Sequence, residues 1–369
     1  MTIRRMGWGI LGTADIARKN WLAILNSGNS VAAIASRDLK RARRFIDTCQ
    51  SHAPMPVLPR AFGSYDELLE CPEVQAVYIP LPTGLRKEWV LRAAAAGKHI
   101  VCEKPCAANL QDLREMLAVC RRHQVQFMDG VMFMHSKRLV RLRKTLQDRN
   151  ALGSIRRITS AFTFCASPDF FTNNIRAHPD LEPHGCLGDL GWYCIRFSLW
   201  AMGWKMPQFV IGRILAQHEQ PNHRKNIISE FSGELVFDGE VSAGFFCSFL
   251  AQNQEWAQIS GTKGYLRVED FVVPFAGKKA DFEVCNHQFV KSGCKFKMEP
   301  QIRRVSVGEH SHGHPSAQES YLFKEFTNVV RSGRLNDDWP QYSLKTQAVL
   351  EACLHSARQG STATACRQD

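Results

Sequence analysis

The stretch GWGILGTADIARKN, residues 7–20, decides the fold of the N-terminal half of this chain. A short apolar run at Ile10 and Leu11 enters glycine-dense sequence, and a helical pattern begins at Ile16. A strand, a tight turn and a helix in that order are typical of the opening of a dinucleotide-binding unit. A plain strand-loop-helix that binds no nucleotide is the alternative interpretation.

Two registers of the glycine fingerprint fit this stretch. Gly7-x-Gly9-x-x-Gly12 matches the pattern letter for letter, but it places the glycines inside the strand. The second register, Gly12-x-Ala14-x-x-Ala17, places the turn after the strand, and we favour it because Gly12 can then make the tight turn. The small side chain of Ala14 lets a pyrophosphate come close to the backbone. The small side chain of Ala17 lets the helix pack closely against the strand. The residues expected to bind the cofactor here are Gly12, Thr13, Ala14, Asp15 and Ile16.

The end of the second expected strand, residues 31–35, bears on which dinucleotide is bound. NAD-binding units usually have an acidic residue there, which accepts hydrogen bonds from the ribose hydroxyls. This chain has Ser36 and Arg37 instead, and an arginine beside a hydroxyl suits a 2'-phosphate. We therefore expect NADP to be preferred, while Asp38, slightly later, keeps NAD as an alternative. The alternative interpretation is that Arg37 is a solvated residue at a helix start.

Length and composition indicate a globular protein of about two domains. The chain has 369 residues, 44% of them hydrophobic and 22% charged, and no apolar run approaches the roughly 18 residues of a membrane span. Thirteen cysteines without a CxxC pair favour reduced thiols, and no secretory signal is recognised, so we expect a cytoplasmic protein. The net charge of +12 is spread without a basic block, so neither nucleic acid nor membrane is an expected partner.

Two loops at the ends of later strands should line the cofactor cleft. The first follows the strand at residues 74–80 and offers Leu81, Pro82, Thr83 and Arg86. The second follows the strand at residues 99–102 and reads Glu103-Lys104-Pro105. Burial of Lys104 beside a positively charged nicotinamide would lower its pKa and suit proton transfer, although other roles for this lysine remain open.

Six motifs in sequence order carry a resemblance that spans nearly the whole chain. The chain resembles the Gfo/Idh/MocA oxidoreductase family, in the style of the dimeric dihydrodiol and D-xylose dehydrogenases and their plant relatives. The motifs are GILGTADIARK (9–19), ASRD (35–38), VQAVYIPLP (74–82), AGKHIVCEKP (96–105), GDLGWYCIR (188–196) and SGTKGYLRVED (260–270).

The resemblance implies an α/β protein of two domains. Residues 1–134 would form an NAD(P)-binding Rossmann domain with a parallel sheet. Residues 135–360 would form an α+β domain with a large, open, mostly antiparallel sheet and closing helices, used for substrate binding and oligomer contact. Residues 361–369 would be a loose tail. We expect a homodimer or a higher homo-oligomer.

The resemblance also implies site residues. Lys104 would be an acid/base or substrate-orienting residue, with Glu103 beside it in the cofactor pocket. His135 and Arg138 are candidates for binding sugar hydroxyls, and a helix-start ion pair or a surface role is the alternative for them. The family commonly has Asn and His where this chain has Thr83 and Arg86, so contacts in that loop are expected to differ.

Asp189 and Tyr193 are four residues apart in a helix expected over residues 188–199. On a helix both side chains project from one face, where a carboxylate and a phenol can hold two sides of a substrate hydroxyl. Many family members have histidine at the position of Tyr193, and the dihydrodiol dehydrogenase branch is similar in having tyrosine. We expect Tyr193 to be the general acid/base beside Lys104, oriented by Asp189. The alternative makes Asp189 an N-cap and Tyr193 a core aromatic residue.

The expected function is hydride transfer between a nicotinamide and a secondary or anomeric alcohol or carbonyl of a sugar, polyol or dihydrodiol. No metal is expected, because the sequence lacks a convincing ligand set. The histidines at 310, 312 and 314 fit an exposed or substrate-contacting loop better than a metal site. The rival hypothesis is a catalytically silent, nucleotide-binding redox sensor or regulatory protein.

Overall fold

The computed structural model describes residues 5–219, 223 and 225–366, and the chain forms two compact units. The first contains residues 1–135, 180–183 and 312–344, and the second contains residues 136–179, 184–311 and 345–369. In this division residues 312–344, near the end of the chain, belong to the first unit. Among the described residues, no helix is long and apolar enough to cross a membrane.

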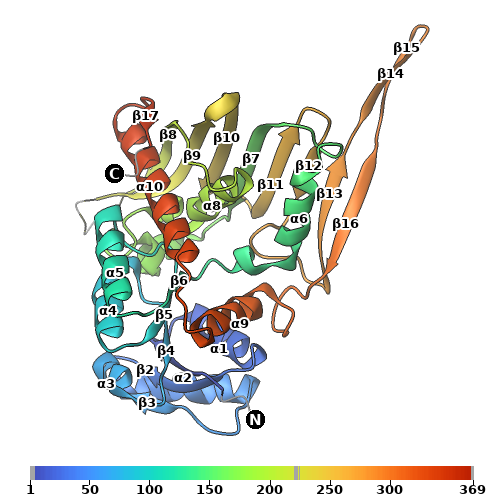
Figure 1. Ribbon diagram of the computed structural model, residues 1–369. Helices are drawn as coiled ribbons and strands as arrows, with labels where there is room; N and C mark the ends of the chain where they lie inside the picture. Colours follow the sequence, from blue (N-terminus) through green and yellow to red (C-terminus); the bar gives the residue numbers. More distant parts are fainter. Residues whose placement is uncertain (1–4, 220–222, 224, 367–369) are drawn as a thin grey trace. The chain divides into compact units, whose positions relative to one another are not determined.

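The first unit is built on a six-stranded parallel sheet (Figure 1). The strand order is β3-β2-β1-β4-β5-β6. Successive strands are added on one side of β1 as far as β3 and on its other side from β4 onward, and this confirms the predicted Rossmann sheet. The strands are nearly all buried, as expected for a sheet covered on both faces. Their bounds are β1 Gly7–Leu11, β2 Ser30–Ala35, β3 Arg60–Phe62, β4 Ala76–Ile79, β5 His99–Cys102 and β6 Phe127–Asp129.

Helices cover this sheet, and two of them, α9 and the start of α10, come from the C-terminal part of the chain. The ring of Trp8 on β1 packs against Phe323 and Phe326 of α9, with centroids 5.0 and 5.2 Å apart. This aromatic contact explains why residues 312–344 belong to the first unit. The helices are α1 Asp15–Asn26, α2 Leu39–His52, α3 Tyr65–Glu70, α4 Thr83–Ala95, α5 Leu110–Arg122, η1 Met132–His135, α9 Gln318–Arg331 and the start of α10 Asp338–Arg358.

The second unit contains a nine-stranded sheet in the order β16-β13-β12-β11-β7-β10-β9-β8-β17. Its neighbouring strands are antiparallel except β7 and β10, which confirms the mostly antiparallel sheet. The bounds are β7 Ile155–Thr163, β8 Phe209–His218, β9 Ile227–Phe237, β10 Val241–Ser248, β11 Gln254–Gly261, β12 Tyr265–Val268, β13 Lys279–Cys285, β16 Ile302–Gly308 and β17 Thr364–Ala365.

The C-terminal segment is partly ordered by this sheet. Thr364 and Ala365 form β17, which pairs with Val210 and Phe209 of β8. The expected loose tail over residues 361–369 is therefore anchored in its described part, and its residues 367–369 lie outside the described residues.

Every residue of α8, a helix of the second unit, is buried. Arg196 of α8 is completely buried, donates to Thr346 Oγ1 at 2.7 Å and lies over the rings of Trp192 and Trp204. Hydrogen bonding and cation–π contact compensate for removing this guanidinium from water. The helices are α6 Lys137–Gln147, α7 Pro168–Asn173, η2 Ile175–Ala177, the π-helical η3 Leu187–Gly191, α8 Trp192–Ala201 and η4 Asp238–Glu240.

Candidate active site

The nucleotide turn lies at the end of β1. Gly12 has φ of +108°, and its backbone N–H donates to the carbonyl of Ala35 at 2.8 Å. The turn favours glycine because of this backbone angle, and a Cβ on Gly12 would in addition come 3.1 Å from Leu81 Cδ2, so that side chain would have to shift. Gly7 and Gly9 lie inside the strand. The strand and the turn thus fall where the second register of the fingerprint predicts them.

Helix α1 begins directly after this turn. Its N-cap is Ala14, whose methyl side chain cannot accept a hydrogen bond, so no side chain caps the first turn. Ala17 is completely buried, as close packing of helix on strand requires. An uncapped helix N-terminus behind a glycine turn suits a pyrophosphate, because the first-turn amides and the helix dipole favour an anion. The residues present therefore fit a dinucleotide, with Thr13 and Asp15 at the same turn.

The end of β2 presents a cationic side chain. Ser36 is buried, with its N–H donating to Phe62 O at 3.2 Å, whereas Arg37 is exposed. Asp38 caps α2, and its carboxylate accepts from the N–H of Lys40 at 2.8 Å. The acidic group is thus engaged in a helix cap, and Arg37 is the exposed cation that follows the end of β2.

Arg86 joins the two loops that were expected to line the cofactor cleft. Its buried guanidinium donates to Leu81 O at 2.6 Å, to Thr83 Oγ1 at 3.0 Å and to Pro105 O. These bonds fix the loop after β4 to the loop that carries Lys104. Arg86, predicted to bind cofactor, has a guanidinium directed at the protein backbone.

Thr83 is held by a residue that sequence reasoning missed. Both its N–H and its Oγ1 donate to the carboxylate of Glu182, at 3.1 and 2.5 Å. Glu182 belongs to the same compact unit, although it lies far along the chain. Nothing in the sequence around Glu182 indicates that its partner is Thr83, 99 residues earlier.

Glu103 fixes the backbone at Lys104. Tyr78 donates to Glu103 Oε1 at 2.6 Å, and the N–H of Lys104 donates to Oε2 at 3.3 Å. Burial and the adjacent carboxylate raise the pKa of Tyr78 well above its usual value, so Tyr78 stays a neutral donor. Gly130 leaves room for the carboxylate, since a Cβ there would lie 2.9 Å from Glu103 Oε1. The Lys104–Pro105 peptide bond is cis.

His135 is buried in the first unit. Its Nδ1 lies 2.8 Å from Glu325 Oε2, and its ring stacks on Trp339 with centroids 4.5 Å apart. Burial, the largest single influence, raises the pKa of the Glu325 carboxyl, but the hydrogen bond and charge of His135, together with a hydrogen bond from Trp339, lower that pKa below its usual value. The structure therefore supplies His135 with protein partners on one nitrogen and one ring face.

Asp189 lies within a π-helical turn, η3, rather than in the regular helix that was predicted. Its Oδ2 lies 3.2 Å from Nε of Arg176, and its side chain is 17% exposed. A Cβ on Gly191 would lie 3.3 Å from Cys247 Sγ, so glycine lets this turn approach β10. The N-cap of η3 is Cys186, so Asp189 does not act as a helix cap. π-Helical turns occur frequently at functional sites.

Tyr193 follows on α8 and belongs to a row of aromatic rings. It is 6% exposed and makes an edge contact with Phe162, with centroids 5.5 Å apart. Phe162 in turn contacts Phe271 at 6.5 Å. This apolar wall can shape a substrate pocket and shield a proton-transfer group from bulk water.

Arg138 forms a buried ion pair at the start of α6. Its guanidinium, 2% exposed, pairs with the carboxylate of Asp270 and donates to Asp270 O at 2.6 Å and Asp281 O at 3.2 Å. This is the helix-start ion pair that the sequence left as the alternative to sugar binding. Because its donors are directed at protein atoms, Arg138 holds the loop after β12.

Glu255 on β11 is a second residue that sequence reasoning missed. It lies opposite Phe162 in the sheet, and its carboxylate accepts from the N–H of Val273 at 2.7 Å. Burial raises the pKa of Glu255 to about 7. It therefore titrates near neutral pH beside the aromatic wall, and an isolated glutamate in a strand gives no such signal.

The histidines at 310, 312 and 314 fall on both sides of the division between the units. His314 Nδ1 lies 2.9 Å from Ser316 Oγ and accepts from the N–H of Ser316 at 3.1 Å, just before α9. His314 thus stabilises a turn at a helix start.

Comparison with known proteins identifies the class and then the family. Residues 6–131 match a family model described as an oxidoreductase family with an NAD-binding Rossmann fold. Residues 140–267 match the GFO/IDH/MocA C-terminal domain. The fold and these matches define an NAD(P)-dependent oxidoreductase acting on CH–OH groups. The chain belongs to the GFO/IDH/MocA family, as its motifs predicted.

Named relatives are dehydrogenases and reductases. The chain is 32% identical to trans-1,2-dihydrobenzene-1,2-diol dehydrogenase of Homo sapiens over 71% of this chain and 73% of that one. It is 32% identical to D-xylose 1-dehydrogenase (NADP(+)) 2 of Haloferax volcanii over 71% and 75%. The 3-ketoreductase KijD10 of Actinomadura kijaniata, solved with NADP and TDP-benzene, superposes with a TM-score of 0.77 at 25% identity, covering 97% and 98% of the two chains.

A more distant structure shows the same fold. The aldose-aldose oxidoreductase of Caulobacter crescentus superposes with a TM-score of 0.77 at 22% identity, covering 98% of this chain and all of that one. Both units of this chain thus have counterparts in a known two-domain architecture.

Proposed function

We propose that this protein transfers a hydride between NADP and a secondary or anomeric alcohol, or the matching carbonyl, of a sugar, polyol or dihydrodiol. The relatives named above act on a dihydrodiol, an aldose and a keto group, which are chemically related by the exchange of CH–OH and C=O. The observation that carries the proposal is Lys104, whose backbone is held by Glu103 at the end of β5 in a nicotinamide-binding sheet. Bound NADP would supply the hydride chemistry.

The protein's own side chains would manage the proton. In the oxidising direction a hydride leaves the substrate carbon and a proton leaves its hydroxyl, and in reduction both return. We assign the proton exchange to Tyr193, whose phenol lies in an apolar wall, and the orientation of the reacting oxygen to Lys104. Asp189, paired with Arg176, would orient the substrate hydroxyl together with Tyr193. His135 and Arg138 would not contact the substrate directly. Through their bonds to Glu325 and Asp270 they would hold the segments around them in place.

The preference for NADP rests on Arg37. A guanidinium bound to the 2'-phosphate contributes about 1.5–3 kcal/mol, which is roughly ten- to a hundredfold in affinity. The test is a fluorescence titration of wild type and Arg37→Ala with NADPH and with NADH. We expect tighter NADPH binding that Arg37→Ala removes while NADH binding stays unchanged. If Arg37→Ala lost affinity for NADPH and NADH equally, or kept its affinity for NADPH, the proposed role of Arg37 would be contradicted.

We further propose that the protein self-associates and works in the cytoplasm. All thirteen cysteines are free thiols, which supports a reducing compartment. One face of the nine-stranded sheet carries a hollow of about 910 Å³ lined by residues such as Arg157, Gly244 and Trp256. A broad face of this kind is one candidate surface for association.

A further inference from the structure

The segment at residues 168–178 of the second unit brings an arginine to the carboxylate of Asp189. Arg176 belongs to η2, and its Nε lies 3.2 Å from Oδ2 of Asp189 in η3. The side chain of Arg176 is 48% exposed, whereas that of Asp189 is 17% exposed. Ion pairs between fully exposed groups contribute little, but this carboxylate is largely removed from water, so the neighbouring cation has a larger effect on its charge.

Aromatic contacts hold this segment at one end of the large sheet. Phe170 of α7 makes an edge contact with Phe249, directly after β10, with centroids 5.1 Å apart. Phe171 stacks on His218, the last residue of β8, at 4.2 Å. Strands β8 and β10 end on the same side of the sheet, because both are antiparallel to β9. The chain that leads to Arg176 is therefore anchored on neighbouring strand ends.

Local contacts also fix the turn that carries Arg176. The side chain of Asn174 caps η2 and accepts a hydrogen bond from the N–H of Arg176 at 3.0 Å. His178 is the C-cap of η2, and its ring lies 4.4 Å from the ring of His223. The turn is thus supported at both ends, and these supports are independent of the ion pair itself.

The surroundings of Asp189 disfavour a charge. The other four residues of η3 are buried. Burial raises the pKa of the Cys247 thiol well above its usual value, and the charge of Asp189 raises it further, so the two groups lie close enough to interact. A carboxyl group in such surroundings tends to keep its proton, and a cation a few ångströms away opposes this. Arg176 therefore favours the ionised form of Asp189.

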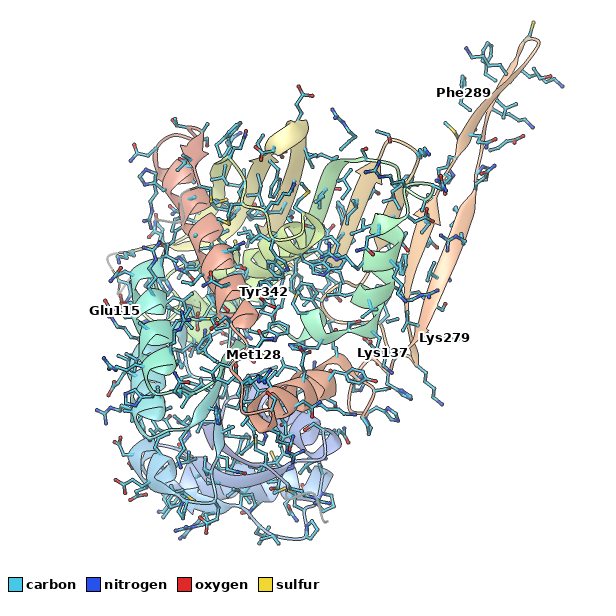
Figure 2. The ribbon with its side chains drawn as sticks, viewed as in Figure 1. Glu115, Met128, Lys137, Lys279, Phe289 and Tyr342 are labelled. Atoms are coloured by element: carbon cyan, nitrogen blue, oxygen red, sulfur yellow. The ribbon has the colours of Figure 1, made fainter. Side chains whose placement is uncertain are left out.

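An ionised carboxylate can only accept hydrogen bonds, and this decides which kind of hydroxyl Asp189 can orient. Asp189 and Tyr193 are four residues apart, across the π-helical turn and the start of α8, so they project from neighbouring positions of one helical surface. Helix α8 lies against β7 and β10, and Figure 2 shows the side chains between the helix and the sheet.

The proton of the reacting hydroxyl is assigned to Tyr193 in the proposed function. A carboxylate paired with a guanidinium is a poor acceptor for that proton, because the pairing favours its charged form. Asp189 is suited instead to a hydroxyl that keeps its proton throughout the reaction. On a sugar or a dihydrodiol, such a hydroxyl is present on the carbon next to the reacting one.

We propose that Arg176 is a positioning residue that holds the Asp189 carboxylate ionised, as the acceptor for a second substrate hydroxyl on the carbon next to the reacting one. The inference rests on the proposed function and narrows its substrates to vicinal diols, with α-hydroxy carbonyls in the reverse direction. An alcohol that lacks the second hydroxyl gives the shielded carboxylate no donor, and a site built to hydrogen-bond a hydroxyl rejects such an analogue strongly.

The test compares matched alcohols as substrates for NADP reduction by the full chain. The pairs are trans-1,2-cyclohexanediol with cyclohexanol, and D-xylose with 2-deoxy-D-xylose, and only the second hydroxyl differs within each pair. We expect the kcat/KM of wild type to be at least about a hundredfold higher for the diol than for its partner. Arg176→Met should reduce this ratio to about tenfold or less, while Arg176→Lys, which keeps the charge, should retain most of it.

Two controls separate this role from a general effect on folding. Arg156 belongs to the same unit, is 53% exposed and pairs with Glu240 at 3.4 Å, so Arg156→Met removes a comparable ion pair. It should leave the ratio unchanged. In an Asp189→Asn background the ratio is already low, and Arg176→Met should not lower it further. NADPH binding and circular dichroism verify that each variant is folded.

The possible contrary results point to different errors. A wild type that oxidises the partner alcohols as efficiently as the diols would overturn the assignment of a second hydroxyl and leave the proposed function intact. An unchanged ratio in Arg176→Met, or an equal loss of kcat/KM for both members of each pair, would show that Arg176 has no part in this selectivity. If wild type reduced NADP with none of the four compounds, the proposed function would itself fail, and this inference with it.

Discussion

Replacing Gly12 with alanine adds a single methyl group at the nucleotide turn, and the structure gives its two consequences. At φ of +108° alanine lies outside the favoured regions for L-residues, which costs about 1–3 kcal/mol of folding free energy. The new Cβ would also lie 3.1 Å from Leu81 Cδ2, on the loop expected to line the cofactor cleft. We therefore expect both a lower melting temperature and a loss of NADPH affinity of about tenfold or more.

Gly28→Ala separates the two effects. Gly28 also has a positive φ, +83°, but a Cβ there would meet nothing within 4 Å. This control should be destabilised through its backbone while NADPH binding stays within about twofold of wild type. The assays are thermal unfolding without nucleotide and fluorescence titration with NADPH. Wild-type NADPH affinity in Gly12→Ala, or equal loss of affinity in both variants, would refute the assignment of the turn to the nucleotide.

Two further predictions concern the second unit. Glu255 has a pKa raised to about 7 from a usual 4.5, so the folded state holds its proton more tightly, and its contribution to stability is lost as pH rises from about 4.5 through 7. In urea unfolding, the free energy of unfolding of Glu255→Gln should therefore rise relative to that of wild type between pH 4.5 and 8. A difference in unfolding free energy that does not change with pH would contradict this. Arg138→Met leaves the carboxylate of Asp270 buried without its partner and should cost about 3–5 kcal/mol of unfolding free energy. The double variant Arg138→Met/Asp270→Asn should recover part of that loss, and no recovery would show that the ion pair is not the cause.

The nucleotide half of the protein was predictable because its signals are local. The turn at Gly12 requires a particular backbone angle, and the buried strands of a parallel sheet appear as short apolar runs. The placement of Lys104 at the end of β5 follows from the same pattern. These features depend on neighbours in sequence, so one chain suffices to locate them.

Other features depend on contacts between distant segments. Packing of Trp8 on Phe323 assigns α9 to the first unit. The hydrophobic periodicity of neither segment predicts this contact. Glu182 holds Thr83 across 99 residues of chain, so its role cannot be read from a motif. The π-helical turn at Asp189 depends on how closely Gly191 approaches β10.

A two-stranded ribbon, in which β14 Gln288–Ser292 pairs with β15 Lys295–Glu299, was not predicted for a different reason. Its strands alternate rings and lysines, but both faces are exposed, so the usual contrast between a buried and a solvated face is absent. The pattern of a single chain reports chiefly on which face packs against its own core.

The measurement that tests the central claim most directly is turnover by wild type and Lys104→Met. NADP is mixed with sugars, polyols and dihydrodiols, and the reduced nicotinamide formed is followed by absorbance. We expect wild type to reduce NADP with at least one such substrate, and Lys104→Met to lose about a hundred- to ten-thousandfold in kcat while it binds NADPH normally. Tight NADPH binding without any turnover by wild type, or full activity in Lys104→Met, would contradict the account.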